Sequence, residues 1–343
     1  MTERLRIFSQ IIHNHFVILN SFQNLKREAE IEDSTKLNEF SLTEYQTKRL
    51  MNKFLIFFFL TLSLSAQIKG VVKDSLSGEP IPYVNIWVEN EAIGTTSETD
   101  GSFSLEIKEE KVLVFSALGY ETKRVASKVQ TVVLKPKVME LKEVIVEQPK
   151  FKKEIEIGNF SKPLGFHISG EIEWSNAKYF KYETIYEQTK FVKKIKFKTR
   201  SKVNNAKFKI RLFSVNKEGF PENDLLEEDI IVTVKKGKKN NLIDVSKFKL
   251  VFPEEGLFVS YEVLKIESNK YEFKYTEFES KKLIKKTYYA PDFECNLADE
   301  QNTYHFRNGK WNKYQRWHNN EVGALKKFNN KVVEPAINLI LTN

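Results

Sequence analysis

The stretch GVVKDSLSGEPIPYVNIWVENEAIGTTSETDGSFSLEI, residues 70–107, decides the fold of the first half of this chain. Apolar and polar residues alternate in it, so that Val84, Ile86 and Val88 share one face of an extended strand. SFSLEI at 102–107 repeats the pattern. Turn-forming residues rich in Gly, Pro and Asp separate these runs, at 74–78, 79–82 and 99–101. The period of two predicts an all-β unit.

The pattern continues downstream in KVLVFSA (111–117) and TVVLKP (131–136). Six or seven short strands within about 80 residues, without a helical period, predict a small antiparallel sandwich. Asp100 and Gly101 supply the positive φ that a tight hairpin requires. Gly119 lets the chain turn so that Tyr120 folds back on the sandwich. We expect structural roles for these residues.

Four motifs in this region resemble the carboxypeptidase regulatory-like domain, also called the carboxypeptidase D regulatory-like or peptidase-associated domain. They are the G-x-V-x-D opening at 70–74, Gly-x-Pro-x-Pro at 78–82, Thr-Asp-Gly-x-Phe at 99–103, and the Gly-Tyr pair at 119–120. The resemblance covers about 67–136. It implies a transthyretin-like, seven-stranded prealbumin (Ig-like) sandwich. It implies no peptidase, because the domain is named for the catalytic domain that it accompanies.

Two further motifs bear on this resemblance. His318-Asn-Asn-Glu321 has the letters of a zinc-peptidase His-x-x-Glu, but no histidine stands among the 22 residues that follow. A three-ligand zinc site is therefore not expected. MELKEVIVEQP at 139–149 resembles the segment that joins this domain to the plug of TonB-dependent receptors. Since no plug follows, we expect a module shared with those receptors rather than a transporter.

The run FLIFFFLTLSL at 54–64 is too short to span a bilayer as a helix, which needs about 20 residues. Lys53 precedes it, and small residues end it at Ser65 and Ala66. We interpret 51–66 as a signal peptide and 1–50 as an over-extended N-terminus, disordered or helical, ahead of the true start at Met51. The product is then secreted across the inner membrane of a Gram-negative bacterium, to the periplasm, outer membrane or cell surface.

The predicted organisation is a regulatory-like β-sandwich at 67–147, a linker at 148–164 and a C-terminal domain at 165–343. Alternation returns in the C-terminal domain, where about eight strands predict a second antiparallel, jelly-roll-like sandwich. The clearest of these strands are KKIKFKTR (193–200), KFKIRLFSV (207–215) and GLFVSYEV (256–263). The fold class is therefore all-β.

Two groups of side chains are candidate ligand-binding sites. The basic rows of 194–200 and 207–211, with Lys196, Lys209 and Arg211 as candidates, form one positive face if their strands are neighbours. Such a face suits acidic glycans, lipopolysaccharide phosphate or anionic headgroups, or it is simply a solvated sheet face. Around the hairpin signal Asn308-Gly309, aromatic rings either stack on sugars or pack in the core; the candidates are Tyr304, Trp311, Tyr314 and Trp317. Tyr288–Asp292 is expected to be a loop.

The net charge of +9 is diffuse, which does not indicate a nucleic-acid partner and allows at most peripheral membrane association. No nucleophile elbow, P-loop or dinucleotide motif occurs, and Cys295 is the single cysteine. We therefore expect no enzyme, cofactor or metal, but a protein that binds or scaffolds, with a glycan or an envelope protein as partner. The alternatives are a glycan-active hydrolase with two facing carboxylates, and a structural adhesion or assembly protein.

Overall fold

The computed structural model describes residues 66–137, 150, 152–160, 167–168, 175–277, 280–317 and 323–343. Ser65–Asn343 forms one compact unit. The expected signal peptide up to residue 65, the segment 139–149 and the motif at 318–321 lie outside the described residues. The described part is mostly β, as predicted, and short 3-10 helices connect some strands at Thr184–Thr189 (η1), Ser246–Phe248 (η2), Glu267–Asn269 (η3) and Gly323–Phe328 (η4).

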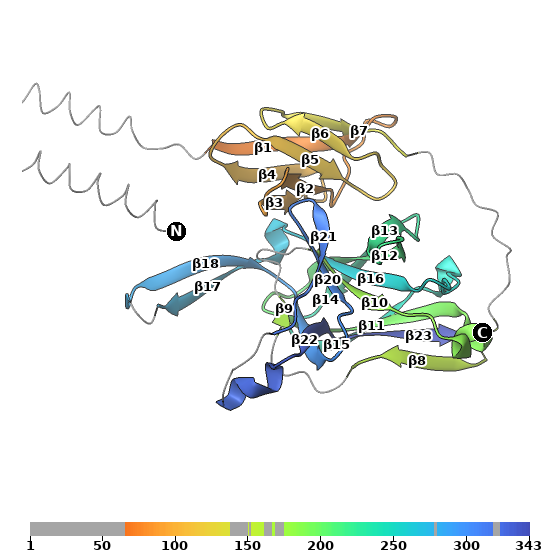
Figure 1. Cartoon of the computed structure of the whole chain (residues 1–343). Helices are drawn as coiled ribbons and strands as arrows, with labels where there is room; N and C mark the ends of the chain where they lie inside the picture. Colours follow the sequence, from red (N-terminus) through yellow and green to blue (C-terminus); the bar gives the residue numbers. More distant parts are fainter. Residues whose placement is uncertain are drawn as a thin grey trace, which may run out of the picture. The chain divides into compact units, whose positions relative to one another are not determined.

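Residues 66–137, which we call the module, fold into two sheets (Figure 1). One has the order β4-β1-β7, with β1 at Ala66–Asp74, β4 at Ser102–Ile107 and β7 at Thr131–Leu134. The other has the order β3-β2-β5-β6, with β2 at Asn85–Val88, β3 at Gly94–Thr96, β5 at Val112–Ser116 and β6 at Lys123–Ala126. The inward residues of both sheets share one core that includes Val72, Phe103 and Phe115.

One pairing in the module departs from the expected antiparallel arrangement. Strand β7 pairs with β1 in parallel, from Val71↔Thr131 to Asp74↔Leu134. The chain reaches β7 from β6, which belongs to the other sheet, so no hairpin fixes its direction.

The C-terminal domain contains two larger sheets. The first has the order β13-β12-β16-β10-β20-β21 with β14 also on β12; the strands are β10 (Ser175–Phe180), β12 (Ala206–Val215), β13 (Pro221–Asp224), β14 (Ile230–Val234), β16 (Leu257–Val263), β20 (Thr303–Arg307) and β21 (Lys310–Lys313). The second has the order β22-β19-β11-β23-β8 with β15 on β11 and β9 on β19; the strands are β8 (Glu154–Gly158), β9 (His167–Ile168), β11 (Phe191–Ser201), β15 (Gly237–Asp244), β19 (Asp292–Ala298), β22 (Val332–Pro335) and β23 (Ile337–Thr342).

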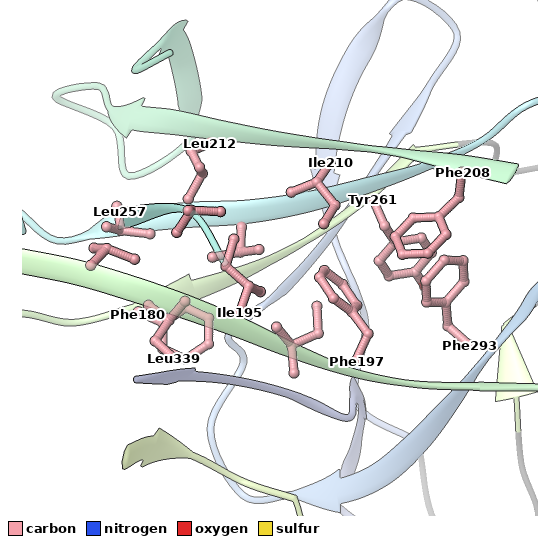
Figure 2. Close-up of a cluster of buried hydrophobic side chains, with 14 of the residues drawn as sticks. Phe180, Ile195, Phe197, Phe208, Ile210, Leu212, Leu257, Tyr261, Phe293 and Leu339 are labelled. Atoms are coloured by element: carbon pink, nitrogen blue, oxygen red, sulfur yellow. The ribbon is translucent and has the colours of Figure 1, made fainter. Parts of the chain in front are cut away.

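The apolar faces of these two sheets meet in one core, shown in Figure 2. Phe208 and Tyr261 come from the first sheet, and Phe197 and Phe293 from the second. The rings of Tyr261 and Phe293 stack with centroids 3.6 Å apart, and Phe208 meets Phe293 edge-on at 5.0 Å. Burial of these large rings supplies much of the hydrophobic stabilisation of the domain.

This arrangement corrects one expectation. The basic rows of 194–200 and 207–211 lie on β11 and β12, which belong to different sheets. They therefore do not form a single positive face on neighbouring strands.

A further hairpin stands apart from both sheets. Strands β17 (Lys270–Thr276) and β18 (Leu283–Tyr289) pair with each other over their full length and form a sheet of their own (Figure 1). Most of their side chains are exposed. Tyr288 and Tyr289, which we expected in a loop, lie in β18, and Asp292 begins β19.

Candidate functional site

The outer face of the first large sheet carries a row of charges because of its strand register. Lys209 on β12 lies opposite Glu262 on β16, and Arg211 lies opposite Ser260. The alternate residues Phe208, Ile210 and Tyr261 point into the core. The charged row therefore faces away from the core, where a sheet would ordinarily meet water.

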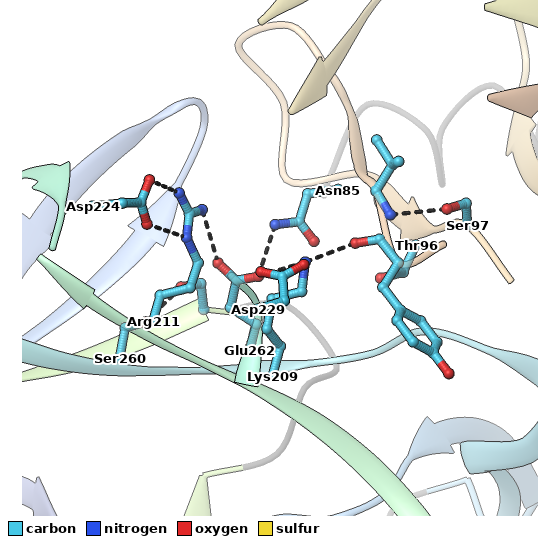
Figure 3. Close-up of polar contacts among 12 residues, drawn as sticks. Asn85, Thr96, Ser97, Lys209, Arg211, Asp224, Asp229, Ser260 and Glu262 are labelled. Atoms are coloured by element: carbon cyan, nitrogen blue, oxygen red, sulfur yellow. Dashed lines mark hydrogen bonds and ion pairs between the residues drawn. The ribbon is translucent and has the colours of Figure 1, made fainter. Parts of the chain in front are cut away.

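Lys209 is nevertheless buried, with 1% of its surface exposed. Its Nζ donates to the carbonyl oxygen of Tyr83 at 2.9 Å and lies 3.1 Å from an Asp229 carboxylate oxygen and 3.9 Å from Glu262 (Figure 3). Tyr83 belongs to the module, so the module covers this lysine. A buried ammonium is tolerated only when carboxylates and acceptors surround it, as they do here.

Arg211 completes the cluster. Its Nε donates to Asp224 at 2.8 Å, and its Nη1 donates to Glu262 Oε1 at 3.3 Å. Burial opposes the charge on Arg211, but the carboxylates of Glu262 and Asp224 outweigh it and raise the pKa of the guanidinium. Arg211 is thus a fixed partner of Glu262.

The module contributes polar groups to the same cluster. Asn85 Nδ2 donates to Glu262 Oε2 at 2.8 Å (Figure 3). Thr96 Oγ1 accepts the backbone N–H of Lys265 at 3.1 Å. Tyr83 reaches Lys209 with its backbone at φ +56°, a conformation that aromatic residues rarely adopt. We call this set, Tyr83, Asn85, Thr96, Lys209 and Glu262, the module joint.

Apolar contacts reinforce the module joint. Tyr83 packs with Leu264 and Ile266 of the C-terminal domain in a small buried cluster. Trp87 of the module meets Phe306 of β20 edge-on, with ring centroids 5.6 Å apart. Hydrogen bonds between the module and the buried Lys209 and Glu262, together with apolar packing, indicate a contact between the module and the C-terminal domain rather than a ligand site.

Next to the module joint is a cleft of about 940 Å³. One wall is the outer face of β1 and β4, with Gln67, Lys69, Ser102, Ser104 and Glu106. The opposite wall comes from the C-terminal domain and the base of the β17–β18 hairpin, with Lys265, Glu267, Lys270, Thr287 and Tyr289. Hydroxyl, amide and oppositely charged groups line it together with one tyrosine ring. This chemistry suits a polar ligand with many hydroxyls.

The carboxylates of the cleft do not have the surroundings of a catalytic pair. Glu106 and Glu267 are exposed, and Glu267 is paired with Lys270 at 3.2 Å. Glu98 accepts the backbone N–H of Glu267 at 2.7 Å. A glycosidase acid is a carboxyl group shielded from water, which raises its pKa. Neither Glu106 nor Glu267 has that shielding.

Other chemistry finds little support in the described part of the chain. No group of three or more His, Cys, Asp and Glu side chains within it is placed to hold a metal ion. Cys295 is completely buried in β19, and burial raises the pKa of its thiol. A buried neutral thiol is a poor nucleophile.

The candidate basic residues lie in separate places. Lys209 and Arg211 belong to the charged cluster beneath the module. Lys196 on β11 pairs with Glu156 of β8 at 2.6 Å and lies over the ring of Phe160 at 5.4 Å. Each of these three residues therefore pairs with a carboxylate of the protein itself.

The candidate aromatic residues do not form one platform. Tyr304 is buried against Phe258, with ring centroids 4.9 Å apart, and Trp311 packs edge-on against Phe213. The Tyr314 hydroxyl donates to Asn176 at 3.1 Å. Trp317 is 37% exposed, and its ring centroid lies 5.2 Å from that of Phe328.

The turn residues of the module lie as follows. Asp100 Oδ1 accepts the N–H of Ser102 at 3.0 Å. Gly101 and Gly119 have φ of +74° and +79°, whereas Asp100, where we also expected a positive φ, does not have one. A Cβ on Gly101 would lie 2.6 Å from the carbonyl oxygen of Val72. The Tyr120 hydroxyl donates to Asp74 Oδ2 at 2.8 Å. These contacts hold the loop ends of the module together.

The comparisons with known proteins concern the module. A family model described as the CarboxypepD_reg-like domain matches residues 68–146. TonB-dependent receptor SusC of Bacteroides thetaiotaomicron is 36% identical over 92 residues, which are 26% of this chain and 9% of the receptor. TonB-dependent receptor P3 of Formosa agariphila is 34% identical over 115 residues, 31% of this chain and 11% of the receptor. The chain thus spans about a tenth of each relative.

Residues 68–146 are a CarboxypepD_reg-like domain, with distant homologues in TonB-dependent receptors, as the motifs predicted. Such a domain is typically non-catalytic, and no catalytic family was found. This homology suggests a cell-envelope module. Among the described residues, no helix has the length and apolar character needed to cross a membrane.

One solved structure, of infectious bursal disease virus Gt strain, aligns with 80% of this chain and 59% of its own, at 8% identity and a TM-score of 0.20. A score this low carries no argument about the fold.

Proposed function

We propose that this chain is a secreted, non-catalytic protein of the cell envelope that binds a glycan in the cleft beside the module joint. The cleft carries the proposal, because its walls present hydroxyls, amides and charges of both signs that suit a polyhydroxylated ligand. Tyr289, which is partly buried against the main core, adds an aromatic ring to the wall. The receptor relatives support an envelope location.

The module joint supports the proposal in a second way. Because the buried Lys209 and Glu262 are hydrogen-bonded to Tyr83 and Asn85 of the module, the two walls of the cleft keep their spacing without a ligand. A preformed site avoids the cost of ordering its walls on binding. The alternative to a glycan is an envelope protein that occupies the same cleft. We do not propose a nucleic-acid partner.

A substitution that fills the cleft tests this proposal. Ser104 is exposed on β4 and lines the cleft, so Ser104→Trp blocks it, whereas the matched Ser104→Ala leaves it open. On a panel of neutral glycans, we expect the tryptophan variant to lose at least about tenfold in affinity, and the alanine variant to bind like wild type. Equal thermal midpoints show that all three are folded. If no neutral glycan binds wild type, or if the tryptophan variant binds normally, the cleft is not the site.

Export belongs to the same proposal. We expect the purified envelope fraction to contain a protein that begins at Gln67, because Ser65-Ala66 ends the signal-peptide pattern. N-terminal sequencing of the fractionated protein checks this. A cytoplasmic product that retains residues 54–64 would argue against secretion.

The finer fold is likewise a proposal: a transthyretin-like sandwich for the module and a jelly-roll-like sandwich for the C-terminal domain. In both, two sheets enclose a common core. An experimental structure whose strand order differs from these folds would refute it.

A further inference from the structure

The β17–β18 hairpin contacts the C-terminal domain at one end and is exposed along the rest of its length. At the base, Tyr271 packs against the main core, and the N–H of Ala290 donates to the carbonyl of Asn269 at 2.8 Å. Farther out, Phe273 is 47% exposed and Leu283 67%. A two-stranded hairpin is marginally stable in water, so an extended one with exposed rings indicates a surface for a partner.

One face of the hairpin is aromatic. The register Tyr271↔Tyr288, Phe273↔Lys286 and Tyr275↔Ile284 puts these residues on the same side. The rings of Phe273 and Tyr275 are inclined by only 29° with centroids 6.2 Å apart, and those of Tyr271 and Tyr288 by 24° at 5.9 Å. Phe273 meets Tyr288 edge-on, with ring centroids 6.2 Å apart, so the two pairs are inclined to each other. The inner pair reaches the core through Tyr271, and the outer pair, Phe273 and Tyr275, supplies the exposed rings that can contact sugars.

The charge of the hairpin identifies the kind of sugar. Six lysines and three glutamates lie between 270 and 289, a net charge of +3. Lys286 lies on the aromatic face, directly opposite Phe273. On the other face, Glu272 is already paired with Lys285 at 2.5 Å. Lys270, Lys274 and Lys285 also lie on that other face, so both faces of the hairpin are positive. A ligand that combines sugar rings with acid groups matches the exposed rings and the positive charge of the hairpin together.

We infer that the aromatic face of the β17–β18 hairpin binds an acidic polysaccharide, with Phe273 and Tyr275 stacking on sugar rings and Lys286 meeting carboxylate or sulfate groups. The structure favours this over an anionic membrane. Insertion into a bilayer requires the apolar side chains on one face, but Leu283 pairs with Thr276 on the face opposite the rings. The site is separate from the cleft, which borders Thr287 and Tyr289 on that opposite face.

The test is affinity electrophoresis of the full chain in gels containing polygalacturonate, dextran sulfate or neutral dextran. We expect retardation by the two acidic polymers and not by dextran. Phe273→Ala combined with Tyr275→Ala is expected to lower the affinity at least about tenfold, whereas Leu283→Ala, the exposed control on the other face, leaves it unchanged. Lys286→Glu is expected to weaken binding more than Lys274→Glu, which changes the same charge on the opposite face.

Several outcomes would overturn the inference. The first is that neither acidic polymer retards wild type. The second is that the lysine reversals act equally and the ring variant binds normally, which would mean simple charge attraction. The third is that vesicles of phosphatidylcholine with phosphatidylglycerol bind through the rings while the polymers do not. Failure of Ser104→Trp to affect neutral glycans would refute the cleft alone, because these polymers report on the opposite face.

Discussion

At the residue scale, Tyr83 shows how a local conformation serves a distant contact. Its φ of +56° is costly for an aromatic residue, and such positions persist only where their surroundings hold them. Its carbonyl accepts from Lys209, its hydroxyl accepts from Lys207 at 3.1 Å, and its ring packs on Leu264. The strain is thus offset by contacts with the other domain.

Asp74 and Tyr120 allow a prediction about pH. Hydrogen bonds from the Ser77 backbone N–H, the Tyr120 hydroxyl and the Leu76 N–H lower the pKa of Asp74 below 3.8. Because the folded pKa is depressed, the stabilisation is present above the unfolded value and is lost as pH falls through the folded one. Tyr120→Phe removes one donor, so we expect the pKa of Asp74 to rise toward its ordinary value.

An NMR titration of the Asp74 carboxyl in wild type and Tyr120→Phe measures this. Asp100, whose pKa is lowered by the Ser102 hydroxyl and N–H, is the internal control and should not move. Identical Asp74 titrations in the two proteins would refute the role of the Tyr120 hydrogen bond.

At the element scale, strands β10 and β22 from different sheets are joined by a buried ion pair. Lys178 is 3% exposed and Glu334 5%, and the two are directly paired. Lys178 Nζ also donates to the carbonyl of Ile337 at 3.0 Å. Burial lowers the pKa of Lys178, and the attraction to Glu334 opposes that effect.

Removing one partner of this pair tests its role. Glu334→Gln leaves a buried ammonium without its counter-charge, and we expect a loss of about 3–5 kcal/mol of unfolding free energy in urea denaturation. The double variant Lys178→Met with Glu334→Leu removes both charges and should lie close to wild type. A single variant as stable as the double one would show that the pair contributes no such constraint.

The strands themselves were largely predictable, because alternation of apolar and polar residues reports the buried face of a strand. Partners were not. KKIKFKTR and KFKIRLFSV have the same pattern, yet β11 and β12 lie in different sheets. The YEFKYTEF segment alternates like any half-buried strand, so its sequence could not show that β17 stands apart.

The candidate sites were less predictable for a related reason. Lys209 alternates with Phe208 and Ile210, which is typical of a solvated lysine, and only the module above it makes it buried. Tyr304 and Trp311 were equally compatible with a platform and with a core, and packing decided for contact with Phe258 and Phe213. Burial by a distant segment leaves no local signal in the sequence.

At the scale of the whole molecule, the module joint predicts cooperative unfolding of 66–343. We expect one thermal transition in wild type, because the module is hydrogen-bonded to the buried Lys209 and Glu262 of the C-terminal domain. Lys209→Ala leaves Asp229 and Glu262 without this cation and should cost about 3–5 kcal/mol. It should also separate the transitions of the module and the C-terminal domain.

Differential scanning calorimetry checks this, with Lys239→Ala, an exposed lysine on β15, as the control. Two resolved transitions in wild type would contradict the prediction. So would a Lys209→Ala variant that melts like the control.

The left-handed Tyr83 and the ring of Trp87 also determine how this protein should be handled. In TonB-dependent receptors the homologous domain is one part of a much longer chain, which invites its treatment as an interchangeable cassette. In this chain, the surface that contains Tyr83, Asn85 and Trp87 lies against the C-terminal domain. A fragment cut at Lys137 would expose it to water, and a module transplanted onto this chain would have to reproduce it. Experiments on the module should therefore use a protein that also contains the C-terminal domain.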